Sequence, residues 1–286
     1  GWTDISQRIR DRILLEVGKG NEFTPELVER AFADSDDEKM EEIRARCNAI
    51  VEDEITAENL KAWYRQLCKR PCFHDEYLQA YNEPTCHLVD TDGKGVTRID
   101  ETGAWVGDDH YELDCLIFAS GFEVGTSYDR RSGYDTIGPG GNRLSRAWED
   151  GMRSMHGIHV HGFPNLFIIG FAQGANLISN ITSNLADAGV TIATVVRHAL
   201  DTGAAEVEVT ADAEDAWMEL LESSPMSTVF GSPDCTPGYY NNEGQPLNSR
   251  ARFAMAGYPY GPVAYFDYID KWRTAGDFEG LEFRSR

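Results

Sequence analysis

The sequence lacks an excess of basic residues and lacks any long apolar run. Its 26 Lys and Arg residues stand against 48 Asp and Glu residues, which gives a formal net charge of −22. Binding to nucleic-acid phosphates needs a basic surface, so a nucleic-acid partner is not expected. The apolar run at residues 166–172 is much shorter than the roughly 20 residues of a membrane-spanning helix. A membrane partner is therefore not expected either.

The sequence also lacks paired cysteines. Its six cysteines are irregularly spaced and include no C-x-x-C pair, a pattern typical of reduced thiols rather than of a disulfide framework. Residues 1–12 are polar and charged, unlike a secretory signal peptide. Hydrophobic residues make up 41% of the chain and aromatic residues 11%, which excludes a disordered acidic tail. These features predict an acidic globular protein of the cytoplasm.

Residues 1–67 carry a helical pattern. The run Thr24–Glu26 predicts a helix start, with an N-cap, a proline in the first turn and an acid near the helix dipole. Apolar residues recur at three- and four-residue steps as far as Ile50, and the acidic run at 34–38 is expected to be a solvated helix start. A further helix is expected at 56–67. Short strands are expected after it, at His87–Asp90, Val96–Ile99 and Ala104–Val106.

Two apolar runs, at residues 113–122 and 166–170, lack the alternation of a half-buried strand. This predicts strands buried on both faces of a parallel sheet. The second run is followed by a loop of small residues and a helical pattern at about 179–200, which is the strand–loop–helix unit of nucleotide-binding α/β domains. Ligands of such sheets lie beyond the carboxyl ends of the strands. Residues 120–122 and 170–176 are therefore candidate ligand-binding segments.

A cluster of sulfur and imidazole ligands suggests a different chemistry. Its members are Cys68, Cys72, His74, Cys86 and His87. Their spacing lacks the paired C-x-x-C knuckle of structural zinc sites, so we expect no metal. A second set, His156, His159 and His161, is explained more simply by loop and packing roles.

Several motifs, in the same order, resemble one flavoenzyme family. The stretch Leu113–Phe122 is similar to the D-x-[IL]-[VI]-x-A-T-G-F motif of FAD- and NADPH-dependent monooxygenases, with Ser120 where Thr is usual. The other matching positions are Lys69–Pro71, Tyr77, Tyr81–Asn82, Val89–Asp90, Trp148, Gly151, Gly157, Gly162–Phe167 and Leu177–Asn180. Residues 50–200 look like the C-terminal half of a Baeyer–Villiger monooxygenase, and the tail resembles it more loosely.

The resemblance implies an α/β fold: the C-terminal portion of a two-dinucleotide-binding-domain flavoprotein with an α-helical insertion. It implies a helical subdomain at 1–67, the return segment of the NADPH-binding domain at 68–114, and the C-terminal part of the FAD-binding domain at 115–286, with an active-site loop at 223–260. The implied reaction uses FAD, NADPH and O2 to insert one oxygen next to a ketone carbonyl, giving an ester or lactone. The aromatic tail suggests a bulky cyclic or polycyclic ketone.

The resemblance also implies site residues. Arg70 is the expected catalytic residue, because a permanent guanidinium suits the negative charge that develops in the reaction. Lys69 is expected beside the NADPH phosphates. The other expected cofactor-binding residues are Ser120, Gly121, Phe122, Gly174, Asn176, Asn180 and Ile181. The expected substrate or NADPH loop contains Tyr239, Tyr240 and Asn241.

The phosphate-binding fingerprint of the family is not found in the sequence. Gly18-Lys19-Gly20 lacks a third glycine, and Gly138–Gly141 follows no apolar strand. Because that fingerprint grips the pyrophosphate of FAD or NADPH, we expect an N-terminal half with both fingerprints to be required, on another polypeptide or as a missing segment. The alternative is a non-catalytic binding or assembly module that retains the C-terminal half of the fold.

Overall fold

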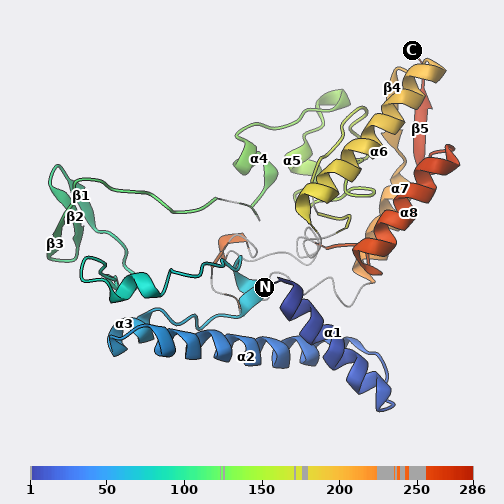
Figure 1. The fold of residues 1–286 in the computed structure, drawn as a ribbon. Coiled ribbons are helices and arrows are strands. Elements are labelled where there is room, and N and C mark those ends of the chain that lie inside the picture. The colour runs from blue at the N-terminus through green and yellow to red at the C-terminus, as the bar shows by residue number, and fades with distance from the viewer. Residues whose placement is uncertain are drawn as a thin grey trace. The chain divides into compact units, whose positions relative to one another are not determined.

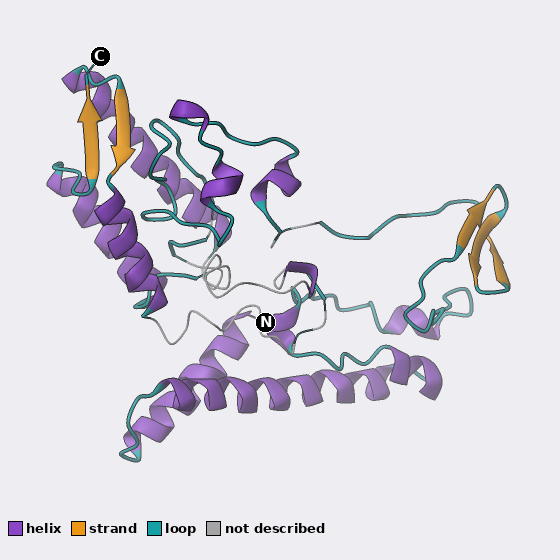
Figure 2. Cartoon of the chain, turned by 180° about the vertical axis from the view of Figure 1, so that it is seen from behind, coloured by secondary structure: helices purple, strands orange, loops and turns teal. Residues whose placement is uncertain are grey.

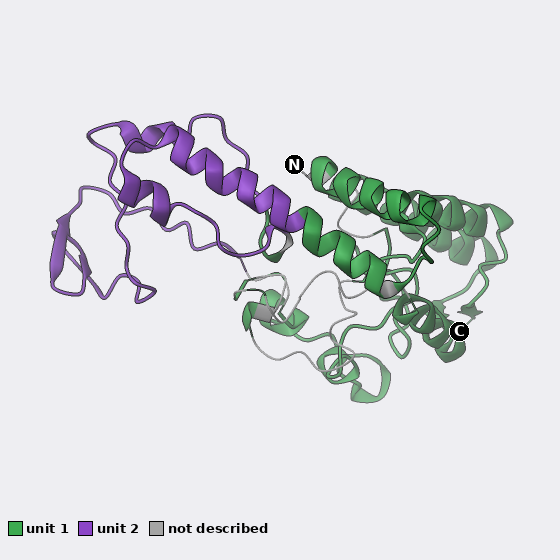
Figure 3. Ribbon diagram, turned by 90° about the horizontal axis from the view of Figure 1, so that it is seen from below, with its two compact units in different colours: residues 1–35, 67–70, 123–286 green, residues 36–66, 71–122 purple. Residues whose placement is uncertain are grey.

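The computed structural model describes residues 2–122, 124, 126–170, 172–175, 180–223, 235, 237–238, 242–244 and 256–285. The chain divides into two compact units, coloured separately in Figure 3. Unit 1 comprises residues 1–35, 67–70 and 123–286, and unit 2 comprises residues 36–66 and 71–122. Among the described helices, none combines the length and the apolar character needed to cross a membrane.

The first fifty residues are helical, as expected, but form fewer and longer helices. α1 spans Trp2–Gly18 and α2 spans Pro25–Ile50 (Figure 1). The cap at Thr24 is confirmed, because the Leu27 amide donates to Thr24 Oγ1 at 3.3 Å. The helix start expected at 34–38 is wrong, because α2 begins at Pro25, although Asp34, Asp37 and Glu38 are exposed as expected. Ser35 and Asp36 lie inside α2 and are buried.

Residues 54–112 form short helices and a three-stranded antiparallel meander. The elements are α3 (Glu54–Asn59), the 3-10 helices η1 (Gln66–Cys68) and η2 (Gln79–Asn82), and the strands β1 (Arg98–Asp100), β2 (Gly103–Val106) and β3 (Asp109–Glu112), paired in the order β1-β2-β3. The helix expected at 56–67 ends early, at Asn59. Beyond its end, Trp63 packs against Arg44, whose guanidinium carbon lies 4.8 Å from the ring centroid. The strand expected at 87–90 is absent from these described residues, so that prediction is wrong.

The C-terminal part of unit 1 packs two long helices and a shorter one with a two-stranded sheet. Its elements are α4 (Tyr128–Ser132), η3 (Pro139–Gly141), α5 (Leu144–Ala147), α6 (Ile181–Thr202), β4 (Glu206–Val209), α7 (Ala211–Glu222), η4 (Asn242–Gly244), α8 (Gly261–Ala275) and β5 (Leu281–Arg284). β4 and β5 pair antiparallel, and α6 lies beside α8 (Figures 1 and 2). Val195, Leu221 and Ile269 are fully buried in this core, where each contributes about 1.5–3 kcal/mol. The helix expected at 179–200 is confirmed as α6.

The two apolar runs expected as buried parallel strands adopt another structure. Residues 113–122 have no regular secondary structure, and Ile117, Phe118 and Phe122 are 82%, 76% and 88% exposed. In the second run Phe167 makes a single bridge to His159. A strand buried on both faces needs hydrogen-bonded neighbours and covering helices. The two sheets of the described residues are antiparallel and involve neither run.

Candidate functional site

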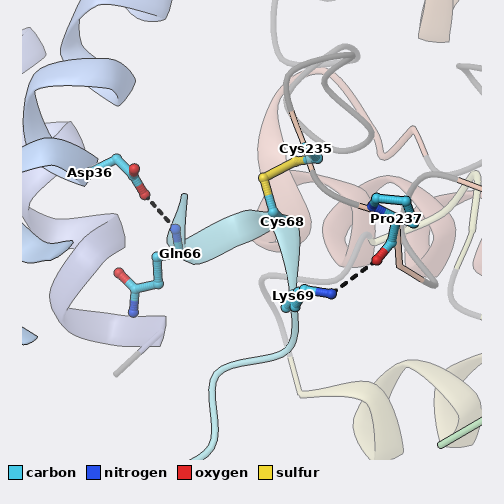
Figure 4. Close-up of a disulfide and its surroundings, with 6 residues drawn as sticks. All are labelled: Asp36, Gln66, Cys68, Lys69, Cys235 and Pro237. Atoms are coloured by element: carbon cyan, nitrogen blue, oxygen red, sulfur yellow. Dashed lines mark hydrogen bonds between the residues drawn. A yellow bond between two sulfur atoms is a disulfide. The ribbon is translucent and has the colours of Figure 1, made fainter. Parts of the chain in front are cut away.

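A disulfide fixes the segment that carries Lys69 and Arg70. Cys68, which is 2% exposed, is bonded to Cys235, 167 residues further along the chain (Figure 4). The prediction that the cysteines are reduced is therefore wrong for this pair. Irregular spacing says nothing about two cysteines that only the tertiary fold brings within bonding distance. The expected cytoplasmic location stays a prediction.

The disulfide also removes one ligand from the zinc alternative. The Cys68 sulfur is already bonded to another sulfur and is no longer a thiolate that could bind zinc. His74 Nδ1 accepts a hydrogen bond from the Glu76 amide at 3.0 Å. Within the described ranges, no group of three or more His, Cys, Asp or Glu side chains is arranged to hold a metal ion.

Lys69 makes a second link to the segment bonded at Cys235. Its Nζ donates to the Pro237 carbonyl oxygen at 2.9 Å (Figure 4). That segment also closes on itself. The Glu243 amide donates to the Gly238 carbonyl at 3.0 Å, and a Cβ on Gly244 would lie only 2.8 Å from Pro237 Cγ. We call the described residues Cys235, Pro237, Gly238 and Asn242–Gly244 the docked turn.

The residues before Cys68 are also held, by a hydrogen bond to helix α2. The Gln66 amide donates to Asp36 Oδ1 of α2 at 2.8 Å (Figure 4). Burial raises the pKa of the Asp36 carboxyl, while the hydrogen bond from Gln66 acts in the opposite direction. Arg70 follows the anchored residues and is exposed. A permanent guanidinium on a held backbone is suited to meet an anion.

The loop that precedes α6 is fixed at Gln173, a residue that sequence reasoning did not single out. The side chain is fully buried: Oε1 accepts from Ser154 Oγ at 2.6 Å, and Nε2 donates to the Met152 carbonyl at 2.6 Å. Its amide donates to the Ala256 carbonyl at 2.8 Å, and its carbonyl accepts from Trp217 Nε1 at 3.0 Å. These bonds hold a left-handed backbone with φ +58°, which costs about 1 kcal/mol or more in a residue other than glycine.

The expected cofactor-binding residues around this loop have structural roles of their own. Gly174 is buried, its carbonyl accepts from the Tyr258 amide at 2.8 Å, and an added Cβ would lie 3.2 Å from Tyr265 Oη. Asn180 is the N-cap of α6, its side chain accepting a backbone amide at 3.3 Å, and Ile181 begins the helix. The positive end of the α6 dipole therefore lies at Asn180. Cofactor binding by these residues stays a prediction.

The remaining expected residues fall into two groups. Ser120, Gly121 and Phe122 belong to unit 2 and are exposed. Gly121 has φ +82°, and no atom lies within 4 Å of the position of an added Cβ, so a ligand has room to approach this backbone. Asn176, Tyr239, Tyr240 and Asn241 lie outside the described residues.

Two of the histidines noted in the sequence belong to a buried aromatic cluster. The His156 ring lies edge-on to Trp217 and Trp272, with centroids 4.7 and 5.0 Å away, and its Nε2 is 3.1 Å from Tyr268 Oη. Burial lowers the pKa of His156 well below its ordinary value, and the charge of His159 acts in the same direction. Burial lowers the pKa of His159 to about 3. Both rings are therefore neutral at pH 7, which confirms their packing role.

Known proteins similar to this chain form one group. No family model matches the chain. A Baeyer–Villiger monooxygenase from Streptomyces coelicolor is 42% identical over 260 residues, which is 90% of this chain and 42% of the relative. Neopentalenolactone D synthase from Streptomyces avermitilis is 38% identical over 286 residues, 99% of this chain and 47% of the relative. The solved structure of a polycyclic ketone monooxygenase from Thermothelomyces thermophila matches with a TM-score of 0.79 and 37% identity, over 92% of this chain and 43% of that one.

More distant solved structures share the fold. Three of them, at 21–23% identity and TM-scores of 0.65–0.70, are described as bound to NADP or in complex with FAD and NADP. The chain spans less than half the length of the curated relatives it matches. These matches confirm the expected family and fold class. By sequence and by fold, this chain corresponds to the C-terminal portion of the Baeyer–Villiger monooxygenases.

Proposed function

We propose that this chain is the C-terminal portion of an FAD- and NADPH-dependent Baeyer–Villiger monooxygenase. The whole enzyme would insert one oxygen of O2 next to a ketone carbonyl to give an ester or lactone. The observation that carries the proposal is the match to such enzymes over 90–99% of this chain. The likeness to a polycyclic ketone monooxygenase at 37% identity supports a bulky polycyclic ketone as the substrate class.

The described residues fit a flavin and a nicotinamide cofactor. Gly121 offers an open backbone beside the exposed ring of Phe122, which suits close approach by a flat ring system. Arg70 offers an exposed guanidinium and Asn180 the positive end of α6, both of which suit anionic groups. When bound, FAD reduced by NADPH would supply the oxygen-transfer chemistry.

Arg70 would act through its permanent charge. A guanidinium does not lose its proton at any physiological pH, so it stabilises negative charge developing on oxygen near the ketone carbon throughout the reaction. The disulfide at Cys68 and the hydrogen bond of Lys69 hold the preceding backbone, which lowers the reorganisation needed when charge appears. The Lys69 ammonium, whose Nζ donates to the Pro237 carbonyl, would bring a positive charge to the NADPH phosphates.

The exposed apolar run supports a requirement for the N-terminal half of the enzyme. Ile117, Phe118 and Phe122 are more than three-quarters exposed, and burying such a side chain yields about 1.5–3 kcal/mol. A parallel sheet in the N-terminal half would satisfy the backbone of residues 113–122 and cover these side chains. That half would also carry the two dinucleotide fingerprints, on the same polypeptide or on another.

The test is to assemble the chain with an N-terminal half that carries both fingerprints, taken from the polycyclic ketone monooxygenase. The complex should be yellow and convert a polycyclic ketone to a lactone with NADPH and O2. Arg70→Ala should lose lactone formation while NADPH still reduces the flavin. Arg197→Ala removes a surface guanidinium that pairs with Asp201 on α6 and should leave turnover unchanged. Full turnover by Arg70→Ala would remove Arg70 from this role, and a colourless complex would favour the assembly-module alternative.

A further inference from the structure

We propose that the Cys68–Cys235 disulfide is a reducible clamp that holds the docked turn on the Lys69–Arg70 segment. Opening the clamp would release the turn and impair the cofactor and substrate contacts of that segment. The effect on catalysis rests on the proposed function. The clamp itself rests on geometry alone and is tested separately.

Two consecutive residues, Cys68 and Lys69, attach the docked turn to their segment of the chain. Cys68 holds Cys235 covalently, and Lys69 holds Pro237 by a hydrogen bond of 2.9 Å. The hydrogen bond is exposed, so water competes for both partners. The disulfide excludes such competition. Loss of the disulfide would therefore leave the docked turn held only by non-covalent contacts, which break and re-form.

The two cysteines differ in exposure. Cys68 is 2% exposed, whereas Cys235 is half-buried. A thiolate reductant therefore reaches the Cys235 sulfur first, forms a mixed disulfide there, and expels Cys68 as the thiolate. Lys69 and Arg70 follow Cys68 directly in the chain, and nearby cations stabilise a departing thiolate.

A dithiol completes the reaction. Its second thiol attacks the mixed disulfide, expels Cys235 as the thiolate, and leaves as a cyclic disulfide. Two electrons pass from the dithiol to the protein disulfide, and the two dithiol protons end on Cys68 and Cys235. The reductant is thus a dithiol such as dithiothreitol, or a dithiol protein of the same chemical class.

The clamp connects two parts of the proposed site. Arg70 lies two residues after Cys68, and the docked turn belongs to the 223–260 region expected to contact NADPH or substrate. Opening should therefore loosen both the guanidinium and the loop. Since neither cysteine is itself expected to touch the reacting atoms, both are positioning residues. Binding constants should change more than the rate of flavin reduction at saturating NADPH.

The first experiment counts thiols in the purified full chain. Iodoacetamide under denaturing conditions should modify four of the six cysteines before reduction and all six after dithiothreitol, as read by intact mass. Six modified cysteines in protein that was never reduced would overturn the clamp. Cys72→Ser is the matched control: it removes a nearby thiol outside the disulfide and should lower both counts by one.

The second experiment measures amide hydrogen exchange in the same chain. Peptides covering residues 66–70 and 235–244 should exchange about tenfold faster after reduction, while a peptide from α6 should not change. Cys235→Ser should show the faster rate without reductant, and Cys72→Ser should behave as the unmodified chain. Equal exchange in oxidised chain, reduced chain and Cys235→Ser would overturn the clamp.

The third experiment uses the enzyme assembled with its N-terminal half. Cys235→Ser should raise KM for NADPH or ketone about fivefold or more and change the flavin reduction rate at saturating NADPH less than twofold. Faster exchange with unchanged KM would overturn the catalytic part of the inference. An assembled enzyme without monooxygenase activity, but with a clamp that opens, would overturn the proposed function and leave the clamp standing.

Discussion

Acid should destabilise unit 1 through its two buried histidines. His159 packs against Phe167 and Trp272, and burial lowers its pKa to about 3 from 6.5. The pKa of His156 is shifted in the same direction by burial and by the charge of His159. Because both pKa values are lower in the folded chain, the unfolded chain takes up protons that the folded chain does not. Stability present above pH 6.5 is therefore lost as the pH falls toward the folded pKa.

The size of the effect follows from His159. Between pH 8 and pH 5.5 the unfolded imidazole becomes about nine-tenths protonated while the folded one stays neutral, which costs roughly 1.4 kcal/mol, or tenfold in the folding equilibrium. His156 adds a loss of the same sign. The net charge of −22 acts the other way, because acid relieves repulsion among carboxylates. The informative quantity is therefore the difference between two proteins that share this charge.

The comparison uses His159→Phe, which keeps an aromatic ring in the cluster and removes its titration. Urea unfolding would be followed by tryptophan fluorescence, since Trp217 and Trp272 contact His156 in the same cluster. Between pH 8 and pH 5.5 the unmodified chain should lose about 1.4 kcal/mol more than His159→Phe. The control His74→Phe replaces an exposed ring and should retain the full acid loss. The same pH dependence in the unmodified chain and His159→Phe would refute the burial argument.

The remaining predictions concern unfolding free energies of the same chain. Gly157→Ala places a Cβ 2.4 Å from a backbone carbonyl oxygen at φ +74° and should cost more than about 2 kcal/mol. Gly189→Ala, in α6 with no atom within 4 Å of the new Cβ, should instead stabilise the chain by up to about 1 kcal/mol. A higher urea midpoint for Gly157→Ala than for Gly189→Ala would contradict both predictions. Gln173→Leu leaves the Ser154 hydroxyl and the Met152 carbonyl without their partner and should cost about 2–4 kcal/mol. A loss under about 1 kcal/mol would show that other contacts hold the loop. Cys235→Ser, which removes the clamp, should lower the free energy of unfolding of the unreduced chain by at most about 5 kcal/mol for a 167-residue loop. An unchanged urea midpoint would count against this prediction.

Local patterns in the sequence were sufficient for several features. The Thr24 cap and α6 were expected from residues within a few positions of each other, and both are present. The strands β1 and β2 were expected near Val96–Ile99 and Ala104–Val106, and they form there. Spacing of apolar side chains and caps acts within one or two turns. Such features therefore need no knowledge of distant residues.

Other features were mispredicted because distant residues decide them. Asp36 reads as a solvated acid in an acidic run, yet it is buried and accepts the Gln66 amide from 30 residues away. Gln173 has no motif, and its importance arises from four hydrogen bonds to separate parts of unit 1. Residues 113–122 have the composition of a buried strand, but strand structure requires a paired neighbour.

The amino-acid sequence alone determined the family, through motifs that occur in the same order as in relatives, and the positions of helices with strong local caps. Only the tertiary structure decided which cysteines join, which histidines lose their proton affinity, and which loop residue is locked in place. The physical reason is the range of the interactions. Helix caps and periodicity depend on neighbours along the chain, whereas disulfide pairing, desolvation and buried hydrogen bonds depend on atoms that only folding brings together.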